Sequence, residues 1–185
     1  KIYNKPKLFR NHGITREPAF LKKKITSHWY YEQICLGFNY RMNEIEAALG
    51  ISQIKKLSMF LKKRHEIANF YRDKLSHLPI KFQKINKKNY SSYHLFIVRL
   101  NFNRIKSNYK NVFNFLRKNK LGINLHYLPI HNQPYYQKRK KYTKLDETIR
   151  YSKTAMSLPI YHGLSKKNMQ YIIQTFSKII QKYTL

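Results

Sequence analysis

The stretch from Leu36 to Leu57, LGFNYRMNEIEAALGISQIKKL, constrains the fold most, because it leads a polar turn directly into a long helical pattern. Gly37 permits backbone conformations that a side chain would penalise. Asn39, Tyr40 and Arg41 then place an amide, a phenol and a guanidinium on three successive residues. The turn therefore carries a dense polar cluster immediately before a helix.

A capping pattern predicts where this helix begins. Asn43 is a favourable N-cap, and Glu46 lies three residues later, where its side chain can reach back to the Asn43 amide. The helix is therefore expected to start at Glu44. A helix start is electropositive and has free N–H groups, so polar residues just before it are well placed to meet an anion. An ordinary capped turn explains the same residues and is the commoner case.

Apolar residues continue at three- and four-residue steps from Ile45 to about His77, which predicts a helical segment of unusual length with a kink near Ser58. Pro79 ends it. A helix this long commonly bridges two domains or lies along a subunit interface.

The remainder of the chain alternates strands and helices, which predicts a small α/β or α+β layer. Gly122 is expected at the C′ position of the first helix, Ser165 is expected to cap the last, and a basic loop is expected from Tyr135 to Lys144. The predicted elements are a strand at 92–100, a helix at 103–120, a strand at 123–127, a helix at 146–155 and a final helix striped by Met169, Ile172, Ile173, Phe176 and Ile179.

The chain is extremely basic, with 38 Lys and Arg against 8 Asp and Glu and a formal net charge of +30. Such a charge suggests a nucleic acid or an anionic membrane surface as a partner. However, the lysines are spread along the whole chain and do not gather on one helix face. A solvated basic surface is the simpler interpretation, so neither a specific nucleic acid nor a membrane is expected as a partner.

One cysteine, Cys35, excludes an internal disulfide and fits a reducing compartment. No apolar run approaches the roughly 20 residues that span a bilayer. A cytoplasmic location is therefore expected.

Residue types alone supply no complete catalytic set. The few carboxylates do not pair, no glycine-rich phosphate loop is present, and the histidines lack zinc spacing, so no metal site is predicted. His126, Tyr127 and His131 surround Pro129 and form the one group that resembles a pocket wall. A strand-end histidine satisfied by a backbone carbonyl is an equally simple explanation.

Four blocks, in their order and spacing, resemble the C-terminal half of the DegT/StrS type of sugar nucleotide aminotransferases. Within that family the chain is most similar to enzymes that aminate UDP-linked 4-keto-6-deoxy-N-acetylhexosamines on the route to pseudaminic acid. The likeness covers essentially all 185 residues. The blocks are Arg10–Ile14, Leu36–Leu57, His126–Tyr136 and Ser157–Ile160.

The resemblance implies a fold-type I, pyridoxal phosphate-dependent transferase that is homodimeric, shares its active sites between subunits and uses glutamate as the amino donor. The fold class it implies is α/β (α+β), truncated at the N-terminus. Residues 1–43 would be the end of the large domain with an active-site loop, 44–78 a long bridging helix, and 79–185 a small C-terminal domain.

The resemblance also assigns site residues. Asn39 matches the asparagine that reaches the cofactor phosphate of the neighbouring subunit. Residues near the substrate are implied to be His12, Tyr40, Arg41, His126 and Tyr127.

The Schiff-base lysine of such enzymes lies upstream of the His12-Gly13 block, and no lysine of this chain sits in its motif. Because that lysine holds the cofactor and carries the proton, the chain alone is expected not to transaminate. It would then be a truncated or split gene product, or half of a complementing pair. The alternatives are a basic nucleic-acid-binding module, supported by the charge and the interleaved tyrosines and lysines, and a non-functional remnant.

Overall fold

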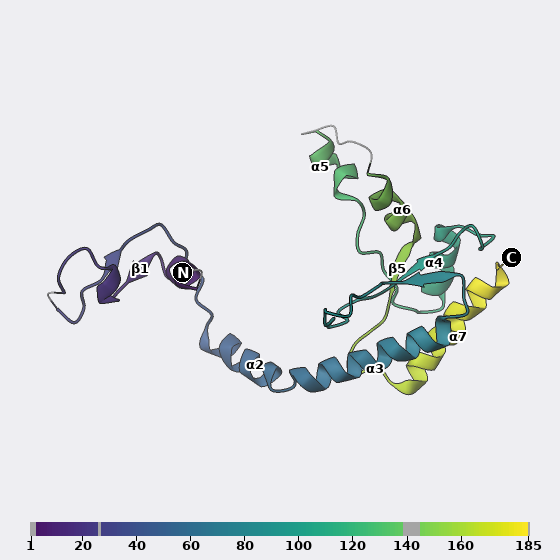
Figure 1. The fold of residues 1–185 in the computed structure, drawn as a ribbon, viewed down its shortest axis with the longest axis horizontal. Coiled ribbons are helices and arrows are strands. Elements are labelled where there is room, and N and C mark those ends of the chain that lie inside the picture. The colour runs from purple at the N-terminus through teal and green to yellow at the C-terminus, as the bar shows by residue number, and fades with distance from the viewer. Residues whose placement is uncertain (1–2, 26, 139–144, 185) are drawn as a thin grey trace. The chain divides into compact units, whose positions relative to one another are not determined.

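The structure is a computed structural model that describes residues 3–25, 27–138 and 145–184. Its contacts divide the chain into two units, Lys1–Lys55 and Lys56–Leu185, and each is described by itself (Figure 1). The boundary falls inside the segment 44–78, so the observed units and the three predicted parts have different limits. The last residues of the predicted basic loop, 139–144, lie outside the described residues.

The second unit is built on a three-stranded antiparallel sheet. Its strands, in spatial order, are β3 (Ile80–Phe82), β4 (Phe96–Leu100) and β5 (Ala155–Leu158). Along β4 the buried residues alternate with half-buried ones, as expected for a strand that turns one face toward a core. All four residues of β5 are buried.

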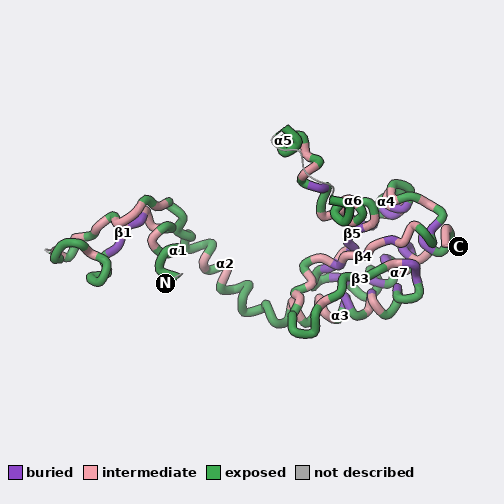
Figure 2. The backbone as a smooth tube through the Cα atoms, turned by 45° about the horizontal axis from the view of Figure 1, so that its top comes forward, coloured by how far each residue is buried: buried purple, intermediate pink, exposed green. Residues whose placement is uncertain are grey.

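Three helices supply most of the remaining core of this unit: α3 (Leu57–Leu75), α4 (Tyr109–Lys118) and α7 (Lys166–Lys182). Helix α7 packs against both α3 and α4. The buried positions concentrate on these helices and on the sheet (Figure 2). The largest fully buried side chains include Tyr71, Leu75, Val98, Leu116, Met156, Phe176 and Ile180.

Helix α6 (Asp146–Thr154) lies against β4 through polar contacts. The Arg99 Nε donates a hydrogen bond to the Thr154 Oγ1 at 3.2 Å, and its guanidinium lies 5.9 Å from the Tyr151 ring centroid. Between α4 and α6 the chain forms two short helices, η2 (Ile130–Asn132) and α5 (Pro134–Gln137).

Two helix predictions in this unit are confirmed, and the one for α7 rests on a side-chain cap and a strong apolar stripe. Ser165 caps α7 by accepting a hydrogen bond from the Asn168 amide at 3.2 Å, and the predicted stripe is buried except for the half-buried Ile173. A helix does run from Asp146, as predicted. For α7, the apolar periodicity and the capping residue were together sufficient to predict the helix from the sequence.

Other predicted limits of helices and strands in this unit were wrong, for local physical reasons. Helix α4 begins at Tyr109, because the Asn108 side chain accepts a hydrogen bond from the Asn111 amide and caps it. The left-handed residue after α4 is Lys120, with φ of 58°, and not Gly122. The predicted strand at 123–127 is reduced to one isolated bridge between Asn124 and Ser157. Strand β3 was not predicted.

The first unit contains short elements: α1 (Asn4–Phe9), β1 (Ile14–Thr15), η1 (Pro18–Phe20), β2 (Glu32–Gln33) and α2 (Glu44–Ile54). Among its described residues only Gly13 and Thr15 are buried, so it has little apolar core of its own. Backbone hydrogen bonds hold it instead. They join residues 9–15 to residues 32–40 in an irregular antiparallel arrangement, which we call the ribbon.

Two glycines allow the two sides of the ribbon to approach. A Cβ on Gly13, whose φ is +72°, would collide with the Cys35 carbonyl, and a Cβ on Gly37 would collide with the backbone of His12 and Gly13. The approach permits the His12 amide to donate to the Phe38 carbonyl at 2.9 Å. Gly37 is therefore required for close packing of backbone against backbone.

The loop between the two sides of the ribbon is held by Glu32. Its carboxylate accepts hydrogen bonds from the Lys22 and Lys23 amides at 2.7 and 2.9 Å and from the Tyr30 hydroxyl at 2.8 Å. These donors favour the ionised carboxylate and lower the pKa of Glu32.

The capping box on α2 is confirmed: the Glu46 amide donates to the Asn43 side chain at 2.8 Å, and the Asn43 amide donates to the Glu46 carboxylate at 3.2 Å. The long helical segment is interrupted at Lys55 and Lys56, slightly earlier than the predicted kink at Ser58. No residue of α2 is buried. Within the described ranges, no helix is long and apolar enough to cross a lipid bilayer.

Truncating a core isoleucine tests the second unit. Ile180 is fully buried, whereas Ile130 is 64% exposed. We expect Ile180→Ala to lower the free energy of unfolding by about 2–5 kcal/mol through lost burial and a residual cavity. The matched variant Ile130→Ala should change it by about 0.5 kcal/mol or less. Urea denaturation of both variants measures the difference, and equal losses would contradict the assigned core.

Adding one methyl group tests the ribbon. Gly37→Ala should force the two backbones apart and accelerate hydrogen exchange of the His12 and Tyr40 amides by about tenfold or more. Gly50→Ala is the control, because nothing lies within 4 Å of a Cβ built there. That change in α2 should stabilise the helix by about 0.5–1 kcal/mol. Unchanged exchange in Gly37→Ala would show that the ribbon is not closed as described.

Candidate functional site

The residues that the sequence assigns to a site fall in both units. Their backbone positions and side-chain surroundings are therefore described separately for each unit. Those in the first unit are His12, Asn39, Tyr40 and Arg41, and those in the second are His126 and Tyr127.

The ribbon fixes the backbone at Asn39 and Tyr40 while leaving their side chains exposed. Asn39 forms an isolated antiparallel bridge with Asn11, and the Tyr40 amide donates to the Arg10 carbonyl at 3.0 Å. The Tyr40 ring stacks on Phe38 with centroids 5.0 Å apart. A held backbone with exposed polar side chains is suited to a ligand that approaches from outside the unit.

Arg41 lines a cavity of about 550 Å³ in the first unit together with two further arginines, Arg10 and Arg16. Glu17, also in the lining, pairs with Lys7 at 2.9 Å, so its charge is already compensated. Three guanidinium groups around one cavity favour an anion, and arginine suits phosphate because its donors can bind two oxygens at once.

Sequence reasoning missed Arg10 and Arg16. The available signal was their placement on either side of the His12-Gly13 turn, which folds the chain back between them. Their approach to Arg41 depends on the ribbon, because it brings residues 9–15 beside residues 32–40. Spacing along the chain alone does not show this.

In the first unit this cavity, and not the start of α2, is suited to an anion. The capping box already satisfies the amides of Asn43 and Glu46. Glu44 and Glu46 also place two carboxylates in the first turn of α2. These carboxylates compensate the helix dipole themselves and repel an incoming anion.

In the second unit, the buried Ser157 orients His126. The Ser157 Oγ lies 2.9 Å from the His126 Nδ1 and 3.1 Å from the Asn124 carbonyl oxygen. The sequence did not indicate this hydrogen bond, since 31 residues separate its partners. Among the described residues no hydrogen bond engages the His126 Nε2, so that nitrogen is available for a further hydrogen bond.

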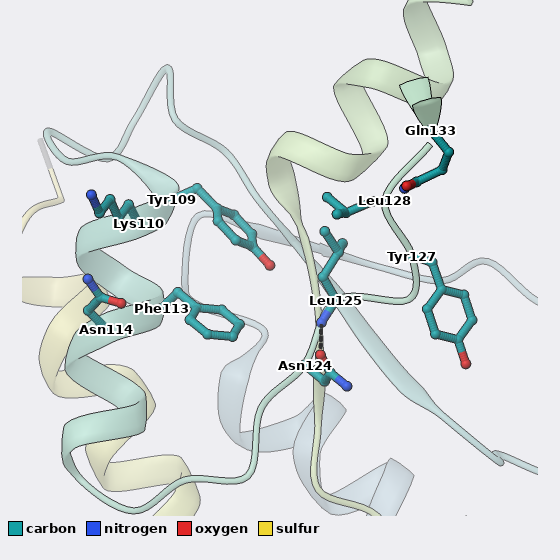
Figure 3. A pocket seen from close by; sticks show the side chains of 9 residues that line it. All are labelled: Tyr109, Lys110, Phe113, Asn114, Asn124, Leu125, Tyr127, Leu128 and Gln133. Carbon is teal, nitrogen blue, oxygen red and sulfur yellow. Dashed lines mark hydrogen bonds between the residues drawn. The ribbon is translucent and has the colours of Figure 1, made fainter. Parts of the chain in front are cut away.

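Tyr127 follows His126, and the two rings meet edge to face with centroids 4.8 Å apart. Its side chain is 73% exposed and lines a cleft of about 630 Å³ beside α4 (Figure 3). For metals, the described residues contain no group of three or more His, Cys, Asp or Glu that could hold an ion.

Comparison with known proteins gives a consistent result. A curated UDP-4-amino-4,6-dideoxy-N-acetyl-beta-L-altrosamine transaminase of Campylobacter jejuni is 33% identical over 184 residues, which are 98% of this chain and 46% of the relative. The structure of Helicobacter pylori PseC, an aminotransferase involved in the biosynthesis of pseudoaminic acid, superposes with a TM-score of 0.80 at 28% identity, covering 98% of this chain and 47% of that chain.

Spr1654 of Streptococcus pneumoniae, solved in its PLP-form, shares the fold with a TM-score of 0.80 at 22% identity, covering 98% of this chain and 44% of that chain. The predicted fold class is thus confirmed: the mixed helix and sheet architecture matches aminotransferase structures. The chain spans about half the length of the curated relatives it matches.

A family model named "DegT/DnrJ/EryC1/StrS aminotransferase family" matches residues 1–177. The match covers the whole first unit, the second unit as far as residue 177, and all six predicted site residues. This chain belongs to the DegT/DnrJ/EryC1/StrS aminotransferase family.

Proposed function

We propose that the chain forms part of a pyridoxal phosphate-dependent aminotransferase that acts on a nucleotide-linked 4-keto-6-deoxy sugar, with glutamate as the amino donor. The substrate class follows from the relatives' names, UDP-altrosamine transaminase and PseC. The single observation in this structure that carries the proposal is the cavity lined by Arg10, Arg16 and Arg41. Its positive charge fits the phosphate groups that both the cofactor and a nucleotide sugar carry.

The residues present can donate hydrogen bonds to the phosphate of a cofactor. The Asn39 amide and the Arg41 guanidinium are exposed, and neither side chain is hydrogen-bonded within the described ranges. Asn39 would donate to the cofactor phosphate of the neighbouring subunit, as in the family. The chemistry that pyridoxal phosphate supplies when bound is the transfer of an amino group from donor to keto sugar.

His126 and Tyr127 would bind the nucleotide sugar. Ser157 fixes the imidazole through Nδ1, so the ring cannot turn freely and Nε2 keeps one direction. Nε2 can therefore hold or accept a proton from a polar atom of the ligand. His12, Tyr40 and Arg41 would complete the contacts on the substrate side.

Exposed apolar residues on α2 support a second subunit as partner. Ile45 is 83% exposed and Ile54 is 70% exposed, and apolar residues occur around most of the helix. A helix of that composition is normally enclosed by protein. A homodimer with shared active sites, or a separate N-terminal half, would cover it.

The net charge alone does not require a nucleic-acid function. A chain with a formal charge of +30 binds any polyanion at low salt. The comparisons lend no support to the nucleic-acid-binding alternative.

Binding of UDP to the 185-residue chain tests the arginine cavity. Arg10→Gln and Arg41→Gln should each raise the Kd for UDP by about tenfold, the effect of losing one charge-assisted hydrogen bond. Arg104→Gln is the matched control, because it removes the same charge from an exposed loop of the second unit. The Kd values are measured by calorimetry at about 0.15 M salt, because this salt concentration weakens non-specific attraction between UDP and the exposed lysines. Equal losses in all three variants would indicate diffuse charge instead of a site.

The chain alone should not transaminate, because none of its lysines lies in the Schiff-base motif of the family. Incubated with pyridoxal phosphate, the purified chain should show no cofactor absorbance band that borohydride fixes to a lysine. It should also release no 2-ketoglutarate from glutamate in the presence of a keto-sugar nucleotide. A single labelled lysine found by peptide mass spectrometry would contradict this expectation.

A further inference from the structure

A polar cavity lies between the sheet of the second unit and helix α6, and we call it the basic cavity. Its volume of about 670 Å³ is within the roughly 300–1,000 Å³ typical of ligand pockets. Residues of β3, β4, the loop at 101–103 and α6 line it, and most of them are polar. It shares no lining residue with the cavity of the first unit or with the cleft that Tyr127 borders.

The lining of the basic cavity carries more positive than negative charge. Its cations are Lys81, Arg99 and Arg150, and Glu147 is the one acidic residue among the described residues that line it. Glu147 is already paired, because its Oε1 lies 2.8 Å from the Arg150 Nη1. Among the described residues, neither Lys81 nor Arg99 forms an ion pair. Two positive charges therefore face the cavity without a counter-charge from the described part of the chain.

The strand register places these two charges directly opposite each other. Lys81 of β3 is the antiparallel partner of Arg99 on β4, so both side chains point to the same face of the sheet. The Cβ atoms of such a pair lie about 5 Å apart, and like charges placed in this way destabilise a sheet. An anion between the two cations replaces their repulsion with two attractions. The register therefore favours a negatively charged ligand at this point.

Arg99 is held in position by α6. Its Nε donates to the Thr154 Oγ1 at 3.2 Å, and its guanidinium lies 5.9 Å from the Tyr151 ring centroid. The Thr154 hydroxyl in turn donates to the Arg150 carbonyl at 2.8 Å, which fixes the acceptor. The two terminal nitrogens of Arg99 have no hydrogen-bond partner among the described residues. They form a fixed pair of donors, an arrangement that suits two oxygens of one phosphate group.

Asn101 adds an uncharged donor just after β4. Its Oδ1 accepts a hydrogen bond from the Asn103 amide at 3.2 Å, and the side-chain nitrogen has no partner in the described part of the chain. Asn101 also lines the basic cavity. A side-chain amide nitrogen can donate two hydrogen bonds, so it can contact a phosphate or a hydroxyl oxygen.

We propose that the basic cavity binds a dianionic phosphate group, carried by a small phosphorylated molecule or present as free inorganic phosphate. The phosphate lies between Lys81 and Arg99, with two of its oxygens on the terminal nitrogens of Arg99. A phosphate monoester has a charge of about −1.5 to −2 at neutral pH, which matches the two uncompensated cations. Asn101 contacts the same ligand. This site does not depend on the aminotransferase function.

Titration of inorganic phosphate into the isotope-labelled 185-residue chain at constant ionic strength tests the site by NMR. The Arg99 Nε–H signal and the Asn101 side-chain amide signals should shift saturably. Because both report on the second unit, phosphate bound near Arg41 does not enter the Kd obtained from them. Lys81→Gln should raise this Kd by about tenfold, as expected for a lost charge-assisted hydrogen bond. Lys84→Gln is the matched control, because Lys84 is exposed and does not line the cavity.

Thermal melting supplies a second measurement. Without phosphate, Lys81→Gln should raise the Tm by about 1–3 °C, because the repulsion between the paired cations is lost. Phosphate at ten times its Kd should raise the Tm of the unchanged chain by about 3–6 °C. The same concentration should raise the Tm of the variant by only about 1–2 °C. A lower Tm for Lys81→Gln without phosphate would contradict the repulsion on which the site rests.

Two NMR results would also overturn the proposal. One is the absence of saturable shifts at Arg99 and Asn101, and the other is an equal rise in Kd for Lys81→Gln and Lys84→Gln, which would indicate diffuse charge. Glycerol 3-phosphate separates the two sources of the phosphate group. Tighter binding than inorganic phosphate would assign the cavity to a phosphorylated molecule, whereas equal or weaker binding would assign it to free phosphate.

Discussion

The close approach of backbone to backbone at Gly13 and Gly37 is the constraint on which the first unit depends. This unit buries little apolar surface, so its shape rests on the hydrogen bonds of the ribbon. Those bonds require that no Cβ stand between the two sides. Because the ribbon is closed, Asn39 and Tyr40 have fixed backbones and exposed side chains, and Arg41 lines a cavity with Arg10 and Arg16.

The second unit is held in a different way. Buried apolar side chains from α3, α4, α7 and the sheet form one continuous core. Ser157 shows how this core also serves the site, since it lies on a fully buried strand and anchors the His126 ring from there. A rigid, packed element thus orients a side chain in a segment that has no regular secondary structure of its own.

The two regions of the candidate functional site differ in chemistry. The cavity of the first unit is lined by guanidinium groups, which suits phosphate. The cleft beside α4 is lined mainly by aromatic and amide groups, which suits an uncharged planar ring.

The sequence by itself indicated the family, the capping box at Asn43 and Glu46, the final helix and its stripe, and six of the candidate site residues. These features depend on motifs, or on interactions between residues three or four positions apart, and both can be recognised along the sequence. Only the tertiary structure decided the break at Lys55 and Lys56, the edge strand β3, the grouping of Arg10 and Arg16 with Arg41, and the anchoring of His126 by Ser157. These features depend on which distant segments meet, and that is set by backbone approach and core packing, which spacing along the chain does not encode.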